Sequence, residues 1–541
     1  MKEDKSETIH NCAECSRRDF MAKLGVLAGM GVLSSDVLAM LPPAVNARLI
    51  PSKTGAKKVR IIYAYHNGGD VQTRADWPNV GYDFRPVMKN MTDTLNWQVK
   101  GIEFVPTHCS CAADARKVVQ ADDANDEFVG FVFVQLNCWN SCVECFDCTS
   151  KAVFYTPLPY AGDGGWLKYT SMLHAAGQKA SHCVSFAALD FSKIVEVAKA
   201  FEVFSKGGTV AEYKAKAEGI VATLVPPDTP PVDVKCVADR VDCRTPDETL
   251  AALKGFKILC VETVNKEVAA ECATTFGIQV ECVKFEEVNA NCRAADPQEA
   301  RKVFDSWKSK ASRIEYVEDE TLLGCAKMYI GMRETLKRHD AQAITVNCLG
   351  GCYKGKLDAY PCLGFMQLQD DGLMGVCEND IQATLTMVVF SALARGRIGY
   401  VSDPVLDMPN RAIVYAHCVS TRRFFGANGP EHTYEILSHS EDRMGASVRA
   451  FAPVGYPVTT VKFNTATRSV ALHTGVIVGN DTDDRACRTK IVARVTGDYS
   501  KMDRVWQPQQ YFWHRVTFIG DFRKDVEDFA AKIGYRVDYE S

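Results

Sequence analysis

The 541-residue sequence lacks a long block of one charge and lacks an apolar run long enough to cross a membrane. Lys and Arg number 63 and Asp and Glu number 67, which gives a formal net charge of −4. Nucleic-acid binding needs clustered Lys and Arg, so we expect no nucleic-acid partner. Cysteine, at 22 residues, is too sparse for a small disulfide scaffold. What remains is a globular composition, 47% hydrophobic and 24% charged, with length for three or four domains.

The first 47 residues resemble a twin-arginine export signal. Ser-Arg-Arg-Asp-Phe-Met at 16–21 precedes an apolar run at 24–33, which is about half the length of a membrane span. Two prolines at 42–43 end the run, and Val-Asn-Ala at 45–47 offers a cleavage site. This resemblance implies the twin-arginine translocation machinery as a partner and a soluble mature protein in the periplasm or outside the cell.

The remaining chain predicts an α/β protein that becomes β-rich toward its C-terminus. Residues 58–65 and 128–136 are apolar runs typical of strands in a parallel sheet. A proline-rich linker at 226–231 precedes a second strand–helix–strand pattern that starts at residue 257. Beyond residue 411, short Val, Thr and Ile runs alternate with turn residues, which favours an antiparallel sandwich or barrel.

We therefore expect two Rossmann-like α/β domains followed by a β-rich C-terminal domain. The expected segments are the signal peptide at 1–47, α/β domains at 58–225 and 232–410, and the β-rich domain at 411–541.

Two acidic residues and a histidine lie at expected element ends in the second half of the chain. Glu378 opens a helix predicted to run to about Ala394, Asp403 follows a strand predicted at 398–401, and His417 follows one at 412–416. Functional residues often lie at such ends. Oxygen and imidazole ligands together suit Mn²⁺, Mg²⁺ or Fe²⁺. By spacing alone, however, a lone Glu at a helix start is more often an acid that caps the helix.

The same region carries motifs that resemble a known enzyme family. They are the stretch from Pro361 to Asp403 (PCL…DDGLMG…CEND…SD) with His417-Cys418, the segment 453–459 (PVGYPVT), Cys-Arg-Thr at 487–489 and the tail 513–521 (WHRVTFIGD). Together they resemble the L-fucose and L-arabinose isomerase superfamily over residues 340–535. The first 340 residues agree with that family only in their α/β architecture.

The resemblance implies a metal-dependent aldose–ketose isomerase that works through an enediol. It implies Mn²⁺ or another divalent cation, with Glu378 and Asp403 as both metal ligands and the acid/base pair. His514 is implied as a further ligand, and His417 matches a ligand histidine of the arabinose branch. The family also implies a sugar substrate and a homo-oligomer, either a trimer or a hexamer.

A cysteine cluster supports different hypotheses. Cys138, Cys142, Cys145 and Cys148 fall within eleven residues, and Cys109 and Cys111 lie on a neighbouring segment. Disulfides are the favoured interpretation in an exported protein, while iron–sulfur ligation and buried free thiols are the alternatives.

Two further residues are candidates for substrate binding. Trp139 follows the apolar strand at 128–136 and can stack on a sugar face, although a packed Trp is the commoner case. His66 follows the strand at 58–65. Both lie after strands, at the sheet edge where α/β proteins bind ligands.

Three functions therefore compete. The first is the isomerase, and the second is a non-catalytic exported carbohydrate-binding protein on the same scaffold. The third is an iron–sulfur redox protein that uses the thiols from Cys138 to Cys148. Because both carboxylates, Glu378 and Asp403, are present, the sequence favours the isomerase.

Overall fold

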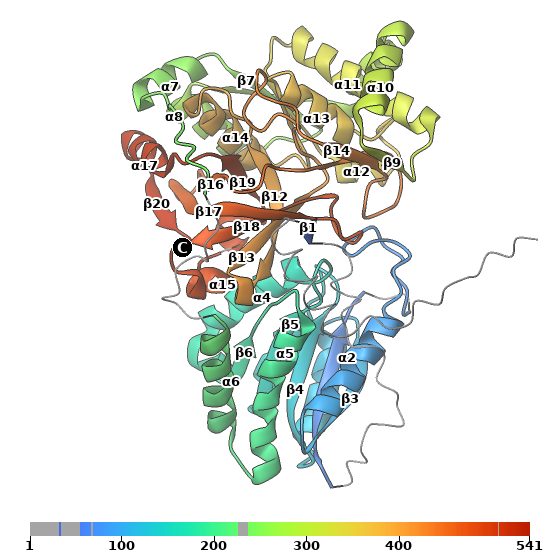
Figure 1. Ribbon diagram of the computed structural model, residues 1–541, viewed down its shortest axis with the longest axis vertical. Helices are drawn as coiled ribbons and strands as arrows, with labels where there is room; N and C mark the ends of the chain where they lie inside the picture. Colours follow the sequence, from blue (N-terminus) through green and yellow to red (C-terminus); the bar gives the residue numbers. More distant parts are fainter. Residues whose placement is uncertain (1–31, 34–54, 67–68, 226–235, 507) are drawn as a thin grey trace, which may run out of the picture.

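The structure is a computed structural model that describes residues 32–33, 55–66, 69–225, 236–506 and 508–541 (Figure 1). The expected linker and nearly all of the expected signal peptide lie outside these ranges, so export stays a prediction. Within the described ranges, no helix is long and apolar enough to cross a membrane.

The N-terminal unit is a parallel five-stranded sheet in the order β3-β2-β4-β5-β6. Strand β4 is almost wholly buried, as its continuous apolar run predicts. The strands are β2 (Lys57–Ala64), β3 (Ile102–Cys109), β4 (Phe128–Gln135), β5 (Ala152–Pro157) and β6 (Cys183–Ser185). The helices are α2 (Arg85–Gln98), α3 (Ala112–Asp123), α4 (Asp163–Ala176), α5 (Phe191–Ala198) and α6 (Val210–Leu224). The strand order reverses between β2 and β4, which makes their carboxyl ends the place where such sheets bind ligands.

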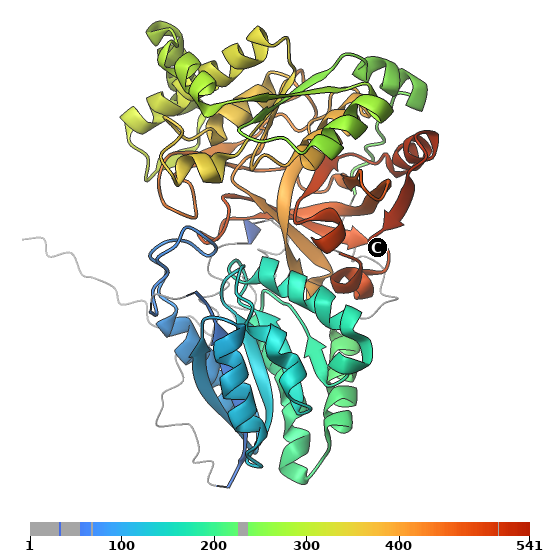
Figure 2. The same cartoon turned by 180° about the vertical axis from the view of Figure 1, so that it is seen from behind.

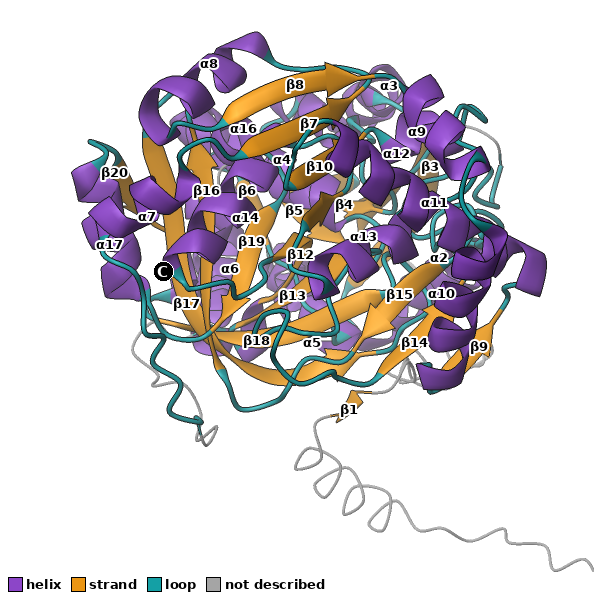
Figure 3. Cartoon of the chain, turned by 90° about the horizontal axis from the view of Figure 1, so that it is seen from above, coloured by secondary structure: helices purple, strands orange, loops and turns teal. Residues whose placement is uncertain are grey.

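The second unit is a parallel four-stranded sheet in the order β11-β10-β7-β8. Its strands are β7 (Lys257–Val261), β8 (Gln279–Val283), β10 (Ala343–Val346) and β11 (Met374–Val376). Its helices are α7 (Pro246–Leu253), α8 (Lys266–Phe276), α9 (Phe285–Arg293), α10 (Pro297–Lys310), α11 (Asp319–Arg338), α12 (Cys348–Cys352), α13 (Cys362–Asp370) and α14 (Ile381–Leu393). Viewed from above, helices flank these strands (Figure 3).

The C-terminal sheet is an antiparallel barrel. Its strands follow the order β17-β16-β19-β12-β13-β18, and pairing between β17 and β18 closes it. They are β12 (Tyr400–Asp407), β13 (Ala412–His417), β16 (Pro457–Asn464), β17 (Ser469–Asp481), β18 (Thr489–Thr496) and β19 (Arg515–Ile519). The short strands β1 (Val32–Leu33) and β20 (Arg536–Tyr539) pair in parallel with β17.

Smaller elements complete the C-terminal part. Strands β9 (Arg313–Glu315), β14 (Tyr434–Leu437) and β15 (Ser447–Ala450) form a separate sheet. The helices are α15 (Met502–Val505), α16 (Pro508–Tyr511) and α17 (Arg523–Lys532). The barrel lies between the two α/β units in both side views (Figures 1 and 2).

The expected class, with parallel α/β units followed by an antiparallel sheet, is therefore confirmed. Strand β12 differs from the expectation at 398–401 because it continues through Pro404 to Asp407. Pro404 pairs opposite Tyr415 of β13, while the pairing of β12 with β19 stops at Ser402. On the side of β12 that faces β19, no described strand pairs with Pro404. A proline is tolerated at such an unpaired edge because no neighbouring strand needs its missing N–H. The barrel thus begins before residue 411.

Candidate active site

Three candidate ligands come from the barrel: two lie in the strands β12 and β13, and the third directly precedes β19. Asp403 lies in β12, opposite Ala416 of β13, so the next residue of β13, His417, lies close to it. On the other side of β12, Ser402 pairs with Arg515, which places His514 beside Asp403. The strand order β19-β12-β13 therefore gathers two histidines and a carboxylate that are far apart in sequence.

Glu378 comes from the second α/β unit. It follows β11 in a turn and does not begin a helix as the sequence predicts, because α14 starts only at Ile381. Glu378 and Asn379 both adopt left-handed backbone conformations, with φ of 63° and 54°. Residues other than glycine rarely adopt this backbone conformation, and residues strained in this way are often found at functional sites. Asn379 holds the turn in place by donating from its backbone N–H to Val346 and from its amide to Thr263.

The four side chains converge on one point. Glu378, Asp403, His417 and His514 each offer a ligand atom, and these atoms all lie within 4.8 Å of one another. His514 Nε2 lies 3.6 Å from Glu378 Oε2 and 3.7 Å from Asp403 Oδ1. His417 Nε2 lies 3.6 Å from Glu378 Oε1. Two ligands on opposite sides of a cation are about 4 Å apart or slightly more, so this spacing accommodates one.

The surroundings of His417 also indicate that the cluster binds a cation. Both ring nitrogens of His417 are buried and have no hydrogen-bond partner. A buried unpaired polar atom is costly unless something binds it. Two carboxylates and two imidazoles form the mixed oxygen and nitrogen set that suits Mn²⁺ or Fe²⁺. The residues therefore fit a divalent cation, whose identity stays a prediction.

The carboxylates face outward and the imidazoles lie behind them. The side chains of Glu378 and Asp403 are 31% and 25% exposed, whereas those of His417 and His514 are 2% and 7% exposed. Burial works to raise the pKa of Glu378, but His514 and His417 hold it below its ordinary value. Burial and the neighbouring Glu378 raise the pKa of Asp403. The two acids therefore differ in proton affinity, although they share one site.

The orientation of His514 depends on a residue to which the sequence reasoning gave no role. His514 Nδ1 lies 2.9 Å from Asp380 Oδ2, which leaves Nε2 facing Glu378 and Asp403. The same oxygen accepts from Lys462 Nζ at 2.5 Å, and the other oxygen caps α14 through Ala383 N–H. Burial works to raise the pKa of Asp380, yet Lys462 and His514 hold it below its usual range. Asp380 belongs to the Cys-Glu-Asn-Asp motif, which was the one available signal for it.

Two tryptophans, Trp139 of the N-terminal unit and Trp513 of the C-terminal part, form a contact that we call the aromatic wall. Trp139 lies in the loop after β4, is 53% exposed, and meets Trp513 edge to face with ring centroids 5.1 Å apart. Trp513 directly precedes His514 in the chain. Trp139 is therefore not a core residue, and it lies where the sheet order predicts ligand binding. The sequence reasoning gave Trp513 no role, and only the tertiary structure places its ring against Trp139.

His66 lies at the same reversal of strand order, after β2. Its ring nitrogen Nε2 is 3.0 Å from Asp76 Oδ2, and its backbone N–H donates to Asn137 in the loop after β4. The β2 loop then reaches the C-terminal part, where Val80 N–H donates to the Glu441 carbonyl. His66 thus has a structural partner, and its contact with substrate stays a prediction.

The cysteine candidates divide into two places. The Cys142 Sγ lies 3.4 Å from the carbonyl oxygens of Cys109 and Cys111, and Cys145 and Cys148 follow in the same 3₁₀ turn. The Cys138 Sγ instead approaches the Ala161 carbonyl, at 3.3 Å.

All six candidate cysteines are free thiols in the structure, so the expected disulfide staple is not formed. Among the described residues, the four-residue acid and histidine cluster is the only group with metal-ligand spacing, and no thiol belongs to it. The structure therefore lends the iron–sulfur hypothesis no support.

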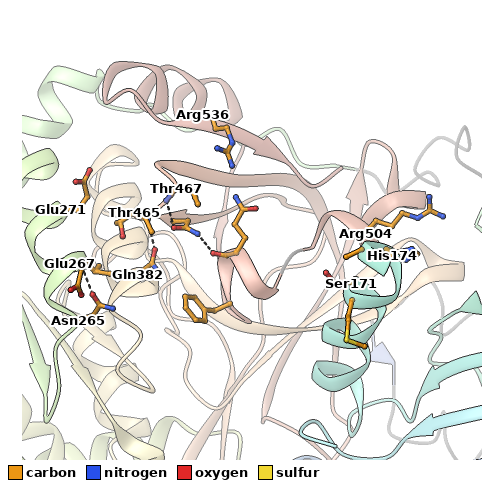
Figure 4. A pocket seen from close by; sticks show the side chains of 17 residues that line it. Ser171, His174, Asn265, Glu267, Glu271, Gln382, Thr465, Thr467, Arg504 and Arg536 are labelled. Atoms are coloured by element: carbon orange, nitrogen blue, oxygen red, sulfur yellow. Dashed lines mark hydrogen bonds between the residues drawn. The ribbon is translucent and has the colours of Figure 1, made fainter. Parts of the chain in front are cut away.

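A cleft of about 1380 Å³ is a separate feature from the four-residue acid and histidine cluster (Figure 4). Side chains from all three units line it, among them His174, Asn265, Thr465 and Arg536. None of the four candidate ligands lines this cleft. The amides there are engaged in the fold: Asn265 caps α8, and Gln382 accepts from Thr465 N–H.

Comparisons with known proteins point to sugar isomerases. The chain is 28% identical over 102 residues to the sulfoquinovose isomerase of Alkalicoccus urumqiensis, which is 19% of this chain and 23% of that protein. It is 24% identical over 155 residues to those of Priestia aryabhattai and Priestia megaterium, which is 27% of this chain and 33% of each relative. The chain thus matches a third or less of the length of these relatives. No family model matches it.

Proposed function

We propose that this protein is a metal-dependent aldose–ketose isomerase. The observation that carries the proposal is the convergence of Glu378, Asp403, His417 and His514 on one point, where both buried ring nitrogens of His417 lack a hydrogen-bond partner. The distant similarity to sulfoquinovose isomerases supports the same reaction class. A non-catalytic carbohydrate-binding protein on this scaffold would tolerate the loss of either carboxylate, whereas both are present here, partly exposed beside buried imidazoles.

The residues divide the chemistry as follows. Isomerisation moves a proton between the two carbons that exchange the carbonyl and hydroxyl groups. Glu378 and Asp403 are the exposed members of the cluster, so we assign the proton transfer to them. The buried His417 and His514 would hold the cation. When bound, a divalent cation polarises the carbonyl and hydroxyl oxygens and offsets the negative charge that develops between them.

The aromatic wall completes the proposed site. A sugar ring presents C–H groups on one face, and an exposed indole offers a flat apolar surface for them. We therefore assign Trp139 and Trp513 to the binding of the sugar face. The candidate substrates are simple aldoses and ketoses and, because of the relatives, sulfonated hexoses such as sulfoquinovose.

Deuterium exchange tests this function. The full chain is incubated with Mn²⁺ and a panel of these sugars in deuterated water, and incorporation at C1 or C2 is followed by NMR. We expect exchange with at least one sugar. We expect Glu378→Gln to lose it by a factor of about 10² to 10⁴, because general acid–base catalysis contributes that much. Conserved exchange in Glu378→Gln would refute the assignment of this site.

A direct binding measurement separates the two leading functions. Protein that binds Mn²⁺ and a sugar but gives no exchange with any sugar of the panel would favour the carbohydrate-binding alternative. Protein that binds no divalent cation would remove the basis of the proposal, because the cluster would then lack its cofactor.

A further inference from the structure

Two buried thiols lie directly behind the turn that carries Glu378. Cys377 precedes Glu378, and Cys348 begins α12 at the end of β10. Their sulfur atoms are 2.8 Å apart, and both residues are buried, at 5% and 4% exposed. A disulfide bond is about 2.05 Å long, so the atoms are already close to bonding distance.

The backbone already places the two residues for a cross-link. Strands β10 and β11 pair in parallel, with Thr345 opposite Val376, so Cys348 and Cys377 follow two adjacent strand ends. The pair also touches the functional turn, because the Glu378 backbone N–H lies 3.4 Å from Cys348 Sγ. This turn holds two consecutive left-handed residues, a conformation that the surrounding structure must stabilise.

We propose that Cys348 and Cys377 form a disulfide that holds Glu378 in position for the cation. The effect on the cation rests on the proposed function, whereas the bond itself does not. Its formation requires an oxidant, which we take to be a small disulfide such as oxidised glutathione. One cysteine thiolate attacks that disulfide and releases the first small thiol. The second thiolate then attacks the mixed disulfide and releases the second small thiol. The protein thereby loses two electrons and two protons, and the small disulfide gains them as it is reduced to two thiols.

Peptide mapping of the full chain under non-reducing conditions tests the bond. The tryptic peptides 339–354 and 357–395 each contain one cysteine of the pair and one other, Cys352 or Cys362. After incubation with oxidised glutathione, we expect the two peptides to be joined, about 2 Da lighter than their sum. The joined species persists in Cys352→Ser/Cys362→Ser and is absent in Cys348→Ser. Separate peptides in the oxidised wild type would overturn the proposal.

Calorimetric titration with Mn²⁺ tests the role of the bond. We expect the reduced wild type to bind Mn²⁺ about tenfold more weakly than the oxidised wild type, as for other groups that orient metal ligands. Cys348→Ala/Cys377→Ala should bind like the reduced protein whatever the redox conditions. Equal affinity of oxidised and reduced wild type, with the bond present by mass, would overturn the positioning role. Failure of both forms to bind Mn²⁺ would count against the proposed function, while the mass result would still decide the bond.

Discussion

Replacing Asp380 by Asn, alone and together with Lys462→Met, distinguishes the orientation of His514 from the stability of the fold. In the native protein, Asp380 accepts from His514 Nδ1 and from the fully buried Lys462. The asparagine keeps the cap of α14, because Asn and Asp are about equally good caps. It loses the negative charge that both His514 and Lys462 use. The amide can also donate to Nδ1, which would favour the histidine tautomer that carries its proton on Nε2 and cannot bind a cation there.

The two effects have different expected sizes. Leaving the Lys462 ammonium buried without its carboxylate costs about 3–5 kcal/mol of stability. Losing the group that orients His514 weakens cation binding by about 10- to 100-fold, or roughly 1.4–2.7 kcal/mol. Asp380→Asn/Lys462→Met removes the stranded charge with a side chain of similar length, so most of the stability should return. The weak cation binding should remain, because His514 still lacks its partner.

Thermal unfolding and calorimetric titration with Mn²⁺ measure the two effects separately. Lys462→Met alone is the matched control, because it preserves the bond between Asp380 and His514. We expect this control to bind Mn²⁺ within about threefold of wild type, although it is less stable. If the double variant bound Mn²⁺ as tightly as wild type, the carboxylate would not be orienting His514, and the reasoning would fail.

Three further predictions concern the surroundings of the site. Trp139→Ala should raise KM for the sugar by about tenfold while changing kcat little, since an aromatic contact is worth roughly 1 kcal/mol or slightly more; a change in kcat alone would argue against stacking. Gly165→Ala should destabilise the protein by about 1–3 kcal/mol, because its Cβ would lie 2.2 Å from the Cys138 carbonyl oxygen. Gly219→Ala, in α6 with open space around it, is the control and should stabilise by about 0.5–1 kcal/mol in thermal unfolding. Burial raises the pKa of Asp163 to about 7, so the folded state holds a proton that the unfolded state has lost. Stability should therefore fall as pH rises from about 4 to 7, by up to about 4 kcal/mol. Asp163→Asn should flatten this dependence; an unchanged pH profile of Tm would show that Asp163 is not the group responsible.

Local patterns predicted much of the architecture. The apolar run of β4 and the strand–helix–strand pattern after residue 257 identified the parallel sheets, because burial on both faces leaves a continuous hydrophobic signal. The alternating runs beyond residue 411 identified the antiparallel sheet. The turn at Glu378 was missed, because two left-handed residues without glycine leave no signal in the sequence.

The candidate site was predicted only as a set of separate residues. Glu378, Asp403, His417 and His514 were named from motifs, but the sequence says nothing about the distances between them. Their convergence depends on the pairing of β12 with β13 and β19 and on the position of the second unit against the barrel. The cysteines show the limit more sharply, since the close sequence spacing of Cys138 to Cys148 produced no cross-link. A contact of 2.8 Å between two thiols instead joins Cys348 to Cys377.

The sequence by itself determined the types of side chain available for chemistry and the local elements that carry them, because residue type and hydrophobic period are local properties. Tertiary structure alone decided that Asp380 bonds both His514 and Lys462, and that Trp139 faces Trp513 across two units. Each of these contacts joins residues that are at least 82 positions apart. Strand register and the packing of the units determine such contacts, and neither can be predicted from the residues next to each position in the sequence.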